Sequence, residues 1–248
     1  MGLAWRSELK ILYHMLLSPI RGHSHAERLE SFYQGQATGY DAFRSRLLHG
    51  RQDLWGALPV PEGGIWLDMG GGTGWNLTYL GAAIDRLAHL YVVDLSPSLL
   101  AMAQQRIEHA GWRNVTPVEA DVTQFTPEHM PVDVVTFSYS LTMIPDWFAA
   151  IDQAWKLLRP GGTVGVVDFY VSRKYPATYA KRHRWLTRTF WPVWFNNDNV
   201  FPSPDHVPYL HDRFEADMFS ERAGTMPYMP GVSVPYYLYI GHKPLEAT

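Results

Sequence analysis

Two patterns of hydrophobic residues alternate along the chain from residue 65 onward. Short uninterrupted apolar runs, rich in Val, Ile and aromatic residues, predict buried strands. These runs occupy residues 65–70, 89–96, 132–140 and 163–171, with a weaker one at 114–122. Stretches with an apolar residue every three or four positions lie between the runs and predict helices. The helical stretches occupy residues 75–87, 96–111 and 145–162, and the last two end at Gly111 and at Pro160-Gly161-Gly162.

This alternation of strands and helices predicts the fold class. A strand, a helix and a further strand pack as a right-handed parallel unit, so we expect an α/β fold with a doubly wound sheet and helices on both faces. Near the end of the chain, residues 214–222 and 235–243 follow each other without a long helix between them. They predict an antiparallel pair that closes one edge of the sheet. Ligands of such sheets bind beyond the carboxyl ends of the strands, so polar residues at those ends are the first candidates for a site.

A helical arm is predicted before the sheet. Apolar residues Trp5, Leu9, Leu12 and Leu16 recur at helical spacing, and a Pro/Gly-rich break follows at 59–64. We therefore divide the chain into an N-terminal arm or lid, residues 1–60, and a main domain, residues 61–248, that carries an aromatic and basic insert at 172–210. No run approaches the ~20 apolar residues of a membrane span, and the first residues do not resemble a secretory signal. The expectation is a cytoplasmic protein with, at most, peripheral contact with the inner face of the membrane.

Composition excludes several classes of function. The 248 residues have a formal net charge of -3, which gives no reason to expect a nucleic-acid partner. The chain has no cysteine, so disulfides and thiolate catalysis are excluded. No metal-ligand spacing occurs, and we expect no metal. The oligomeric state is left open.

The segment IWLDMGGGTGWNL, residues 65–77, joins a predicted strand to a predicted helix through a cluster of glycines. A phosphate-binding loop would need a Lys after the glycines, and none follows. The dinucleotide fingerprint Gly-x-Gly-x-x-Gly, begun at Gly70, would need glycine where Trp75 stands. The pattern that fits is acid-x-Gly-x-Gly-x-Gly, formed by Asp68, Gly70, Gly72 and Gly74.

This pattern resembles the cofactor loop of class I S-adenosylmethionine-dependent methyltransferases. That cofactor has no pyrophosphate, so its loop needs no phosphate nest, but it must let the methionine portion lie flat on backbone without Cβ atoms. The resemblance implies S-adenosylmethionine as cofactor and S-adenosylhomocysteine as product. It also implies a Rossmann-like, mostly parallel seven-stranded sheet with an antiparallel last strand, and an insert between the fifth and sixth strands.

Two further strand ends extend the predicted cofactor site. Asp94 comes twenty residues after Gly74, where a carboxylate can accept the ribose hydroxyls, and Leu95 follows it. By the resemblance, Asp121 faces the adenine amino group and Val122 lies against the ring. Ser138 ends another strand and is predicted to border the same site. The segment 32–43 resembles the part of small-molecule methyltransferases that folds over the cofactor, which would bring Tyr33 and Tyr40 into the active site.

Residues for the acceptor side are predicted from the segment 137–144 and from the insert. Tyr139 and Met143 follow the strand that ends beside the predicted sulfonium. The insert combines five Lys or Arg residues between Lys174 and Arg188 with several Trp and Phe residues. Such residues can form a solvated face and a core, or a lid over an anionic, partly apolar substrate at a bilayer surface. His206 is a candidate proton acceptor, with a structural role as its alternative; Tyr139 and Tyr33 are the other predicted catalytic residues.

A narrower resemblance covers most of the chain. Residues 18–44, 137–176 and 190–210 look like the N-methyltransferases of bacterial betaine-lipid synthesis, which methylate the amine of diacylglyceryl-homoserine three times. The resemblance implies a substrate with an amine, a carboxylate and two acyl chains. Arg173, Lys174 or Arg184 would then meet the carboxylate. Tyr139, Tyr170 or Tyr175 would surround the amine, because aromatic faces attract cations.

Other acceptors and one other class of protein fit the same residues. Within the class, the acceptor could be a phosphoethanolamine-type lipid, a small amine or a quinone carbon, or the aminocarboxypropyl group could be transferred in place of the methyl group. A catalytically silent S-adenosylmethionine-binding regulator is the alternative of a different class. A dinucleotide oxidoreductase is disfavoured by the glycine spacing.

Overall fold

The computed structural model describes residues 46–196, 199–227, 229 and 231–245. Most of the predicted arm, with Tyr33 and Tyr40, lies outside the described residues. The part of the arm inside them ends in the helix α4, Arg51–Ala57.

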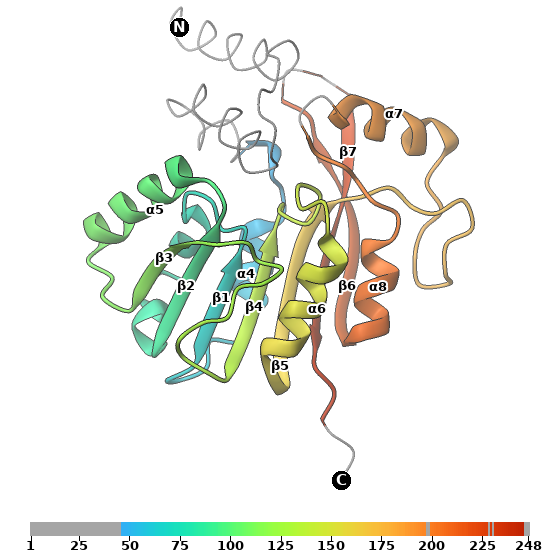
Figure 1. Ribbon diagram of the computed structural model, residues 1–248. Helices are drawn as coiled ribbons and strands as arrows, with labels where there is room; N and C mark the ends of the chain where they lie inside the picture. Colours follow the sequence, from blue (N-terminus) through green and yellow to red (C-terminus); the bar gives the residue numbers. More distant parts are fainter. Residues whose placement is uncertain (1–45, 197–198, 228, 230, 246–248) are drawn as a thin grey trace, which may run out of the picture.

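The described residues form one seven-stranded sheet in the order β3-β2-β1-β4-β5-β7-β6 (Figure 1). Five strands are parallel, and β7 runs antiparallel to both of its neighbours. The strands are β1 (Ile65–Met69), β2 (His89–Asp94), β3 (Val115–Glu119), β4 (Val132–Ser138), β5 (Leu158–Phe169), β6 (Glu215–Thr225) and β7 (Ser233–His242). The predicted α/β fold, with an antiparallel pair at one edge, is confirmed.

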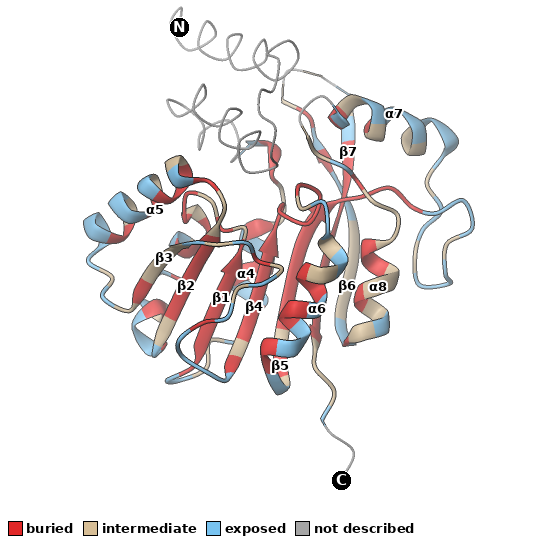
Figure 2. Cartoon of the chain, viewed as in Figure 1, coloured by how far each residue is buried: buried red, intermediate tan, exposed pale blue. Residues whose placement is uncertain are grey.

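Helices cover both faces of the sheet, and each face has its own hydrophobic core. On one face pack α4, α5 (Pro97–Ala110) and α7 (Trp185–Asn196), with Trp55, Ala103 and Phe195 among the buried contacts. On the other face pack α6 (Trp147–Leu157) and α8 (His206–Arg213), with Ile151 and Leu210 buried. Burial is nearly continuous along β1, β4 and the second half of β5, which explains why these segments form uninterrupted apolar runs in the sequence (Figure 2).

Two predicted elements differ from the observed ones. The stretch 75–87 forms two short 3₁₀ helices, Trp75–Tyr79 and Gly81–Arg86, instead of one α-helix. Gly81, the first residue of the second helix, has φ of +53°, a left-handed conformation that interrupts an α-helix. The helix α6 ends at Leu157, before Pro160, and β5 begins at Leu158, because the residues that precede a proline favour extended backbone.

Among the residues that the structure describes, no helix has the length and apolar character needed to cross a bilayer. The predicted cytoplasmic location stays a prediction.

Candidate active site

The glycine loop lies at the carboxyl end of β1 and is fastened to β2 by its own backbone. The amides of Gly70 and Gly71 both donate to the carbonyl of Val93, at 2.8 and 3.1 Å. Gly70, Gly72 and Gly74 all have positive φ, between +55° and +72°, which glycine adopts without steric cost. The glycine at every second position of the sequence pattern therefore corresponds to three residues in the left-handed conformation.

Gly70 is also required by close packing. A Cβ atom at Gly70 would lie 2.4 Å from the Cβ of Ser140, in the segment that follows β4. The hydroxyl of Ser140 donates to the carbonyl of Met69 at 2.8 Å, which holds the two segments together. Gly72 differs, because a Cβ there would meet only ordinary contacts with Leu99 and Asp94. The loop is thus clamped at its first glycine and open above its second.

Asp94 fixes the middle of the loop from the end of β2. Its Oδ2 accepts the amide of Gly72 and its Oδ1 accepts the amide of Ser96, both at 2.9 Å. Ser96 is also the N-cap of α5, with its hydroxyl accepting from the amide of Leu99. The carboxylate therefore joins the glycine loop, β2 and the start of α5, and it is half-buried at the edge where the ribose is predicted to bind.

Asp68 lies beneath the loop rather than facing the ligand side. The residue is fully buried, and its carboxylate accepts hydrogen bonds from the Thr136 hydroxyl at 2.8 Å and the Asn76 amide at 3.5 Å. Burial raises its pKa to about 7, against the opposing effect of these hydrogen bonds. Contact of Asp68 with the cofactor stays a prediction. A Cβ at Gly71 would lie 2.8 Å from the Asp68 carboxylate, so the acid supports the loop from below.

A small apolar cluster flanks the loop on the side of α5. Met143 and Leu99 are buried together, with Leu95 and Val200 packed against them. Leu95 was predicted in the cofactor site, whereas Met143 was predicted to contact the acceptor and here lies beside the residues of the cofactor side. Val200 belongs to the insert, which returns to the site: the amide of Phe201 donates to the carbonyl of Thr142 at 2.7 Å.

The acid at the end of β3 is placed differently from Asp94. Asp121 is exposed, and its carboxylate accepts from the amide and hydroxyl of Thr123 at 2.9 and 2.7 Å. Val122 beside it is buried in the core of the α6 face. Contact of either residue with an adenine ring stays a prediction.

The hydroxyl groups of Ser138, Ser140 and Thr142, at the end of β4 and after it, all make hydrogen bonds within the fold. The hydroxyl of Ser138 accepts from Trp55 Nε1 of α4 at 3.0 Å. That of Thr142 donates to the carboxylate of Asp168 at 2.7 Å. With Ser140 on Met69, each hydroxyl ties β4 to a different neighbour: the arm, β5 and β1. These hydrogen bonds give each of the three hydroxyl groups a structural role in the fold.

Tyr139 is held in an uncommon conformation at this strand end. Its φ is +57°, and its buried hydroxyl donates to the carbonyl of His49 at 2.7 Å. Its ring packs against Phe169, with centroids 4.5 Å apart. Burial raises its pKa well above the ordinary tyrosine value, so the group stays protonated at neutral pH. The geometry makes Tyr139 a link between β4 and the arm, and its catalytic role stays a prediction.

A second fully buried acid, Asp168, lies near the end of β5. It accepts from the backbone amides of Thr142 and Phe169, at 3.2 and 2.8 Å, besides the Thr142 hydroxyl. Burial raises its pKa to about 7. Asp168 holds the segment after β4 in register with β5, much as Asp68 supports the glycine loop.

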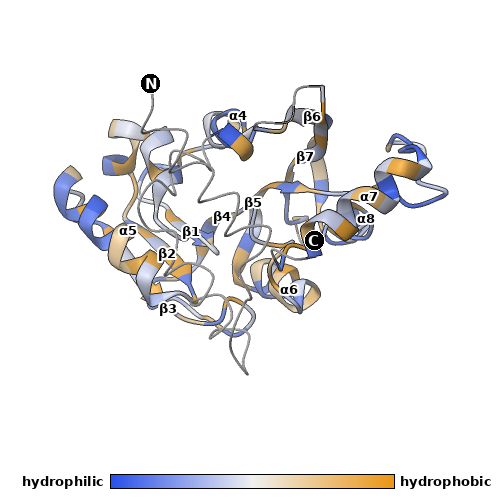
Figure 3. Ribbon diagram, turned by 90° about the horizontal axis from the view of Figure 1, so that it is seen from above, coloured by the Kyte–Doolittle hydropathy of each residue, from blue (hydrophilic) through white to orange (hydrophobic). Residues whose placement is uncertain are grey.

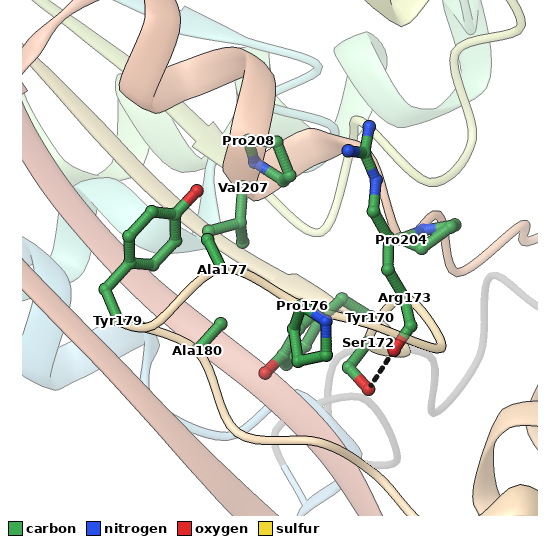
Figure 4. A pocket seen from close by; sticks show the side chains of 10 residues that line it. All are labelled: Tyr170, Ser172, Arg173, Pro176, Ala177, Tyr179, Ala180, Pro204, Val207 and Pro208. Carbon is green, nitrogen blue, oxygen red and sulfur yellow. Dashed lines mark hydrogen bonds between the residues drawn. The ribbon is translucent and has the colours of Figure 1, made fainter.

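A pocket opens beyond β5, between the insert and the start of α8 (Figure 4). Its walls are mostly small and apolar, with Arg173 and Ser172 as polar side chains. The lining residues are Tyr170, Ser172, Arg173, Pro176, Ala177, Tyr179, Ala180, Pro204, Val207 and Pro208. The hydroxyl of Tyr170 is buried without a hydrogen-bond partner among the described residues. Tyr170 and Arg173, both predicted to bind the acceptor, are thereby brought together.

The other predicted acceptor residues are not brought to this pocket. Arg173 forms an ion pair with Asp205 at 2.6 Å. Lys174, Tyr175 and Arg184 are exposed on the outer surface of the insert, and none of them lines the pocket. Contact of these three residues with an acceptor stays a prediction.

His206 is placed where it has no contact with solvent. It is fully buried, neither ring nitrogen has a hydrogen-bond partner among the described residues, and Trp147 packs edge-on at 4.6 Å. Burial lowers its pKa to about 3. This placement favours the structural alternative over the proton acceptor. Within the described residues, no cluster of three or more His, Asp or Glu side chains could hold a metal ion.

Comparison with known proteins now identifies the domain built around this loop. Residues 67–162 match the model of a methyltransferase domain family. The chain is 22% identical to a demethylmenaquinone methyltransferase of Anoxybacillus flavithermus, over 89% of this chain and 98% of the relative. Residues 67–162 therefore form an S-adenosylmethionine-dependent methyltransferase domain, and the sheet has the strand order of class I methyltransferases. The methyltransferase also matches a ubiquinone/menaquinone biosynthesis C-methyltransferase of Allorhizobium ampelinum, at 33% identity over 42% of this chain and 40% of the relative.

Solved structures share the fold of the methyltransferase at low identity. A phosphoethanolamine N-methyltransferase of Haemonchus contortus, solved with phosphomonomethylethanolamine and S-adenosylhomocysteine, superposes with a TM-score of 0.65 at 14% identity, over 90% of this chain and 61% of that one. A Haloferax volcanii methyltransferase bound to its Trm112 activator superposes with a TM-score of 0.64 at 17% identity, over 84% and 95%.

The residues around the loop fit S-adenosylmethionine. Gly72 leaves its backbone uncovered, Asp94 presents a half-buried carboxylate, and Leu95 with Leu99 supplies an apolar wall. When bound, the cofactor supplies an electrophilic methyl group on a sulfonium. The protein's part is to hold and orient the cofactor and acceptor and to exclude water, and in-line displacement depends mainly on that positioning.

Several structural partners of the site were not found from the sequence. Trp55 binds Ser138, and Val200 packs against the Leu99–Met143 cluster, both across long separations in the chain, whereas Asn76 binds Asp68 only eight residues away. Only Leu99 carried a usable signal, since it belongs to the apolar stripe of a helix that begins at the end of a predicted strand.

Proposed function

We propose that the methyltransferase acts on the amine of a lipid head group, with diacylglyceryl-homoserine as the first substrate to test. One observation carries the proposal: the aromatic and basic insert between β5 and α8 ends against the cofactor side of the site. Val200 packs against the cluster of Leu99 and Met143, and the Phe201 amide donates to the Thr142 carbonyl. The betaine-lipid resemblance quoted from the sequence is most specific in this same insert.

Aromatic residues at the end of β5 and on α7, buried in the core beside this end of the sheet, are compatible with an amine acceptor. The rings of Phe169 and Phe195 stack at 4.9 Å, and Trp191 packs on Phe195 at 5.5 Å. Aromatic faces attract a methylated ammonium without forming hydrogen bonds that each methylation would remove. The acceptor amine must lose the proton it carries at neutral pH before its lone pair forms the new bond to carbon. The carbon–sulfur bond breaks in the same step.

Quinone C-methylation is the second candidate, because the curated relatives favour it. The A. flavithermus demethylmenaquinone methyltransferase aligns over almost its whole length. A quinone ring would suit the same aromatic walls, and the apolar pocket beyond β5 would suit either acceptor. The fold similarity to a phosphoethanolamine N-methyltransferase is compatible with the amine but does not choose between them.

The test is to incubate the purified chain with labelled S-adenosylmethionine and each acceptor in detergent, and to analyse the products by mass spectrometry. The proposal expects the mass of diacylglyceryl-homoserine to rise by one, two and three methyl groups. Phosphatidylethanolamine and demethylmenaquinone are incubated in parallel. Methylation of demethylmenaquinone alone would replace the lipid amine by the quinone as substrate.

A further inference from the structure

The insert has an unusual charge for this protein. The part of the insert before Asp198, residues 172–196, contains six Lys or Arg residues and neither Asp nor Glu, although the whole chain has a formal net charge of -3. The positive charge is therefore concentrated in one segment and is opposed by negative charge elsewhere. Such a segment is attracted to anionic surfaces within about a Debye length.

The helix α7 of this segment is apolar on two opposite sides. Its inner side buries Trp191 and Phe195 in the core. Its outer side exposes Leu186 and Val193, which are 63% and 70% exposed, with Phe190 between them at helical spacing. Trp185, at the start of the helix, is 67% exposed. A helix buried on one face normally presents polar residues on the other, so this outer apolar side is unexplained by the fold.

Exposed aromatic and basic residues also alternate in the loop before α7. Tyr175 is 74% exposed, with the Lys174 ammonium 5.3 Å and the Arg182 guanidinium 5.7 Å from its ring centroid. Lys181 is exposed in the same loop. Aromatic rings beside cations are typical of the level of lipid head groups, where the ring sits among the heads and the cation meets phosphates.

The loop and α7 lie at the periphery of the domain, on the opposite side of the sheet order from α5 (Figures 1 and 3). We propose that these residues, 172–196, form a docking surface for an anionic lipid bilayer. The cations would meet the phosphates, and the outer side of α7 would enter the head-group boundary. Charge complementarity favours a bilayer over a second copy of this acidic chain. The inference rests on the proposed function in that docking would bring a lipid acceptor to the site that Val200 and Phe201 border.

The test is flotation of the full chain with vesicles of phosphatidylcholine alone or mixed with phosphatidylglycerol. Neither lipid carries the proposed acceptor amine, so binding is measured apart from methyl transfer. We expect binding to the mixed vesicles that falls as salt is added. Replacing two cations, Lys181→Gln with Arg182→Gln, should weaken the binding roughly 25-fold, at about fivefold for each cation near the surface.

Two further variants separate the contributions. Trp185→Ala with Leu186→Ala should weaken binding about tenfold through lost apolar insertion and should leave the salt dependence unchanged. Arg113→Gln with Lys156→Gln makes the same charge change at exposed positions far from the insert in the fold, after α5 and near the end of α6, and should leave binding unchanged. Circular dichroism and S-adenosylhomocysteine binding check that each variant is folded.

Three results would overturn the docking surface: equal binding to both kinds of vesicle, equal loss in the control variant, or a change of oligomeric state in the α7 variant. That last result, seen by light scattering, would mean that a second copy of the chain covers the patch. Vesicle binding without methylation of any lipid amine would refute the proposed function and leave the docking surface standing. Methylation of diacylglyceryl-homoserine without vesicle binding would support the proposed function and refute the docking surface.

Discussion

The ends of β1 and β2 and the ends of β4 and β5 lie on the same edge of one sheet, yet they are built in different ways. The first region, which we call the cofactor edge, consists of a short loop whose backbone amides are bound by Val93 and Asp94. The second, the acceptor edge, depends on side chains from the arm, the insert and α8.

The two regions also differ in how completely their buried polar groups are satisfied. At the cofactor edge the carboxylates of Asp68 and Asp94 both accept hydrogen bonds. Near the acceptor edge the hydroxyls of Tyr170 and Tyr237 and both ring nitrogens of His206 are buried without partners among the described residues. Each such group costs about 1–3 kcal/mol, and proteins retain them mostly where function or strain requires. The cofactor edge is therefore the preorganised region of the two.

The largest test of that preorganisation is Gly70→Ala. The new Cβ would lie 2.4 Å from Ser140 Cβ, and the alanine would have to adopt the glycine's φ of +72°. Left-handed strain and overpacking together should lower the free energy of unfolding by roughly 5 kcal/mol, measured by urea unfolding. Gly81→Ala is the matched control, since Gly81 also has positive φ but nothing within 4 Å of its Cβ. It should cost only ~1–2 kcal/mol; equal losses would refute the close packing at Ser140.

A second test uses the buried acid beneath the loop. The pKa of Asp68 rises from 3.8 to about 7 on folding, so between these values the folded state holds a proton that the unfolded state has lost. This contribution to stability is complete below the unfolded pKa and is lost as pH rises through about 7. Asp68→Asn cannot titrate. Relative to wild type, the variant should gain roughly 4 kcal/mol of unfolding free energy between about pH 4 and about pH 8.

Any loss of stability that Asp68→Asn causes equally at both pH values does not affect this test, because the prediction concerns how the difference from wild type changes with pH. Urea unfolding followed by tryptophan fluorescence at the two pH values measures it. A difference between Asp68→Asn and wild type that does not vary with pH would show that Asp68 titrates normally. Asp168→Asn should have a lower free energy of unfolding than wild type at every pH. Its new amide group would face the Thr142 backbone amide, so that two donors would meet without an acceptor.

The third test removes the carboxylate that organises the loop. Asp94→Ala deletes the acceptor for the amides of Gly72 and Ser96 and the predicted partner of the ribose hydroxyls. Binding of S-adenosylhomocysteine, measured by calorimetry, should weaken by about 3 kcal/mol, or roughly 100-fold. Asp121→Ala is the comparison at the next strand end, where the exposed carboxylate accepts from Thr123 and would add only the predicted contact with the adenine amino group, so its loss should be smaller. Similar losses in both variants would contradict the special position of Asp94.

The contrast between the two regions also explains what the sequence could predict. Asp68, the glycines and Asp94 were found because their geometry depends on residues within one strand-turn-helix unit, where spacing along the chain determines position in space. Trp55 on Ser138 and Val200 on Met143 depend on packing across the fold, and no local pattern encodes it. The partners of the hydroxyls after β4 were not found for the same reason: they lie 26 to 83 residues away along the chain.

The smallest effect concerns His206, which separates a structural from a catalytic role at the acceptor edge. Its ring is fully buried against Trp147, its nitrogens have no partner among the described residues, and its pKa is lowered to about 3. His206→Phe keeps an aromatic ring and removes two unsatisfied polar atoms, so stability at about pH 8 should rise by about 1 kcal/mol. The gain should grow by about 2 kcal/mol at about pH 5, where the unfolded histidine of the wild type binds a proton that the folded one excludes. Methyl transfer should stay within about twofold of wild type, because a ring that is neutral and enclosed at neutral pH does not accept the acceptor's proton. Loss of activity in a variant with unchanged or increased stability would restore His206 as the proton acceptor.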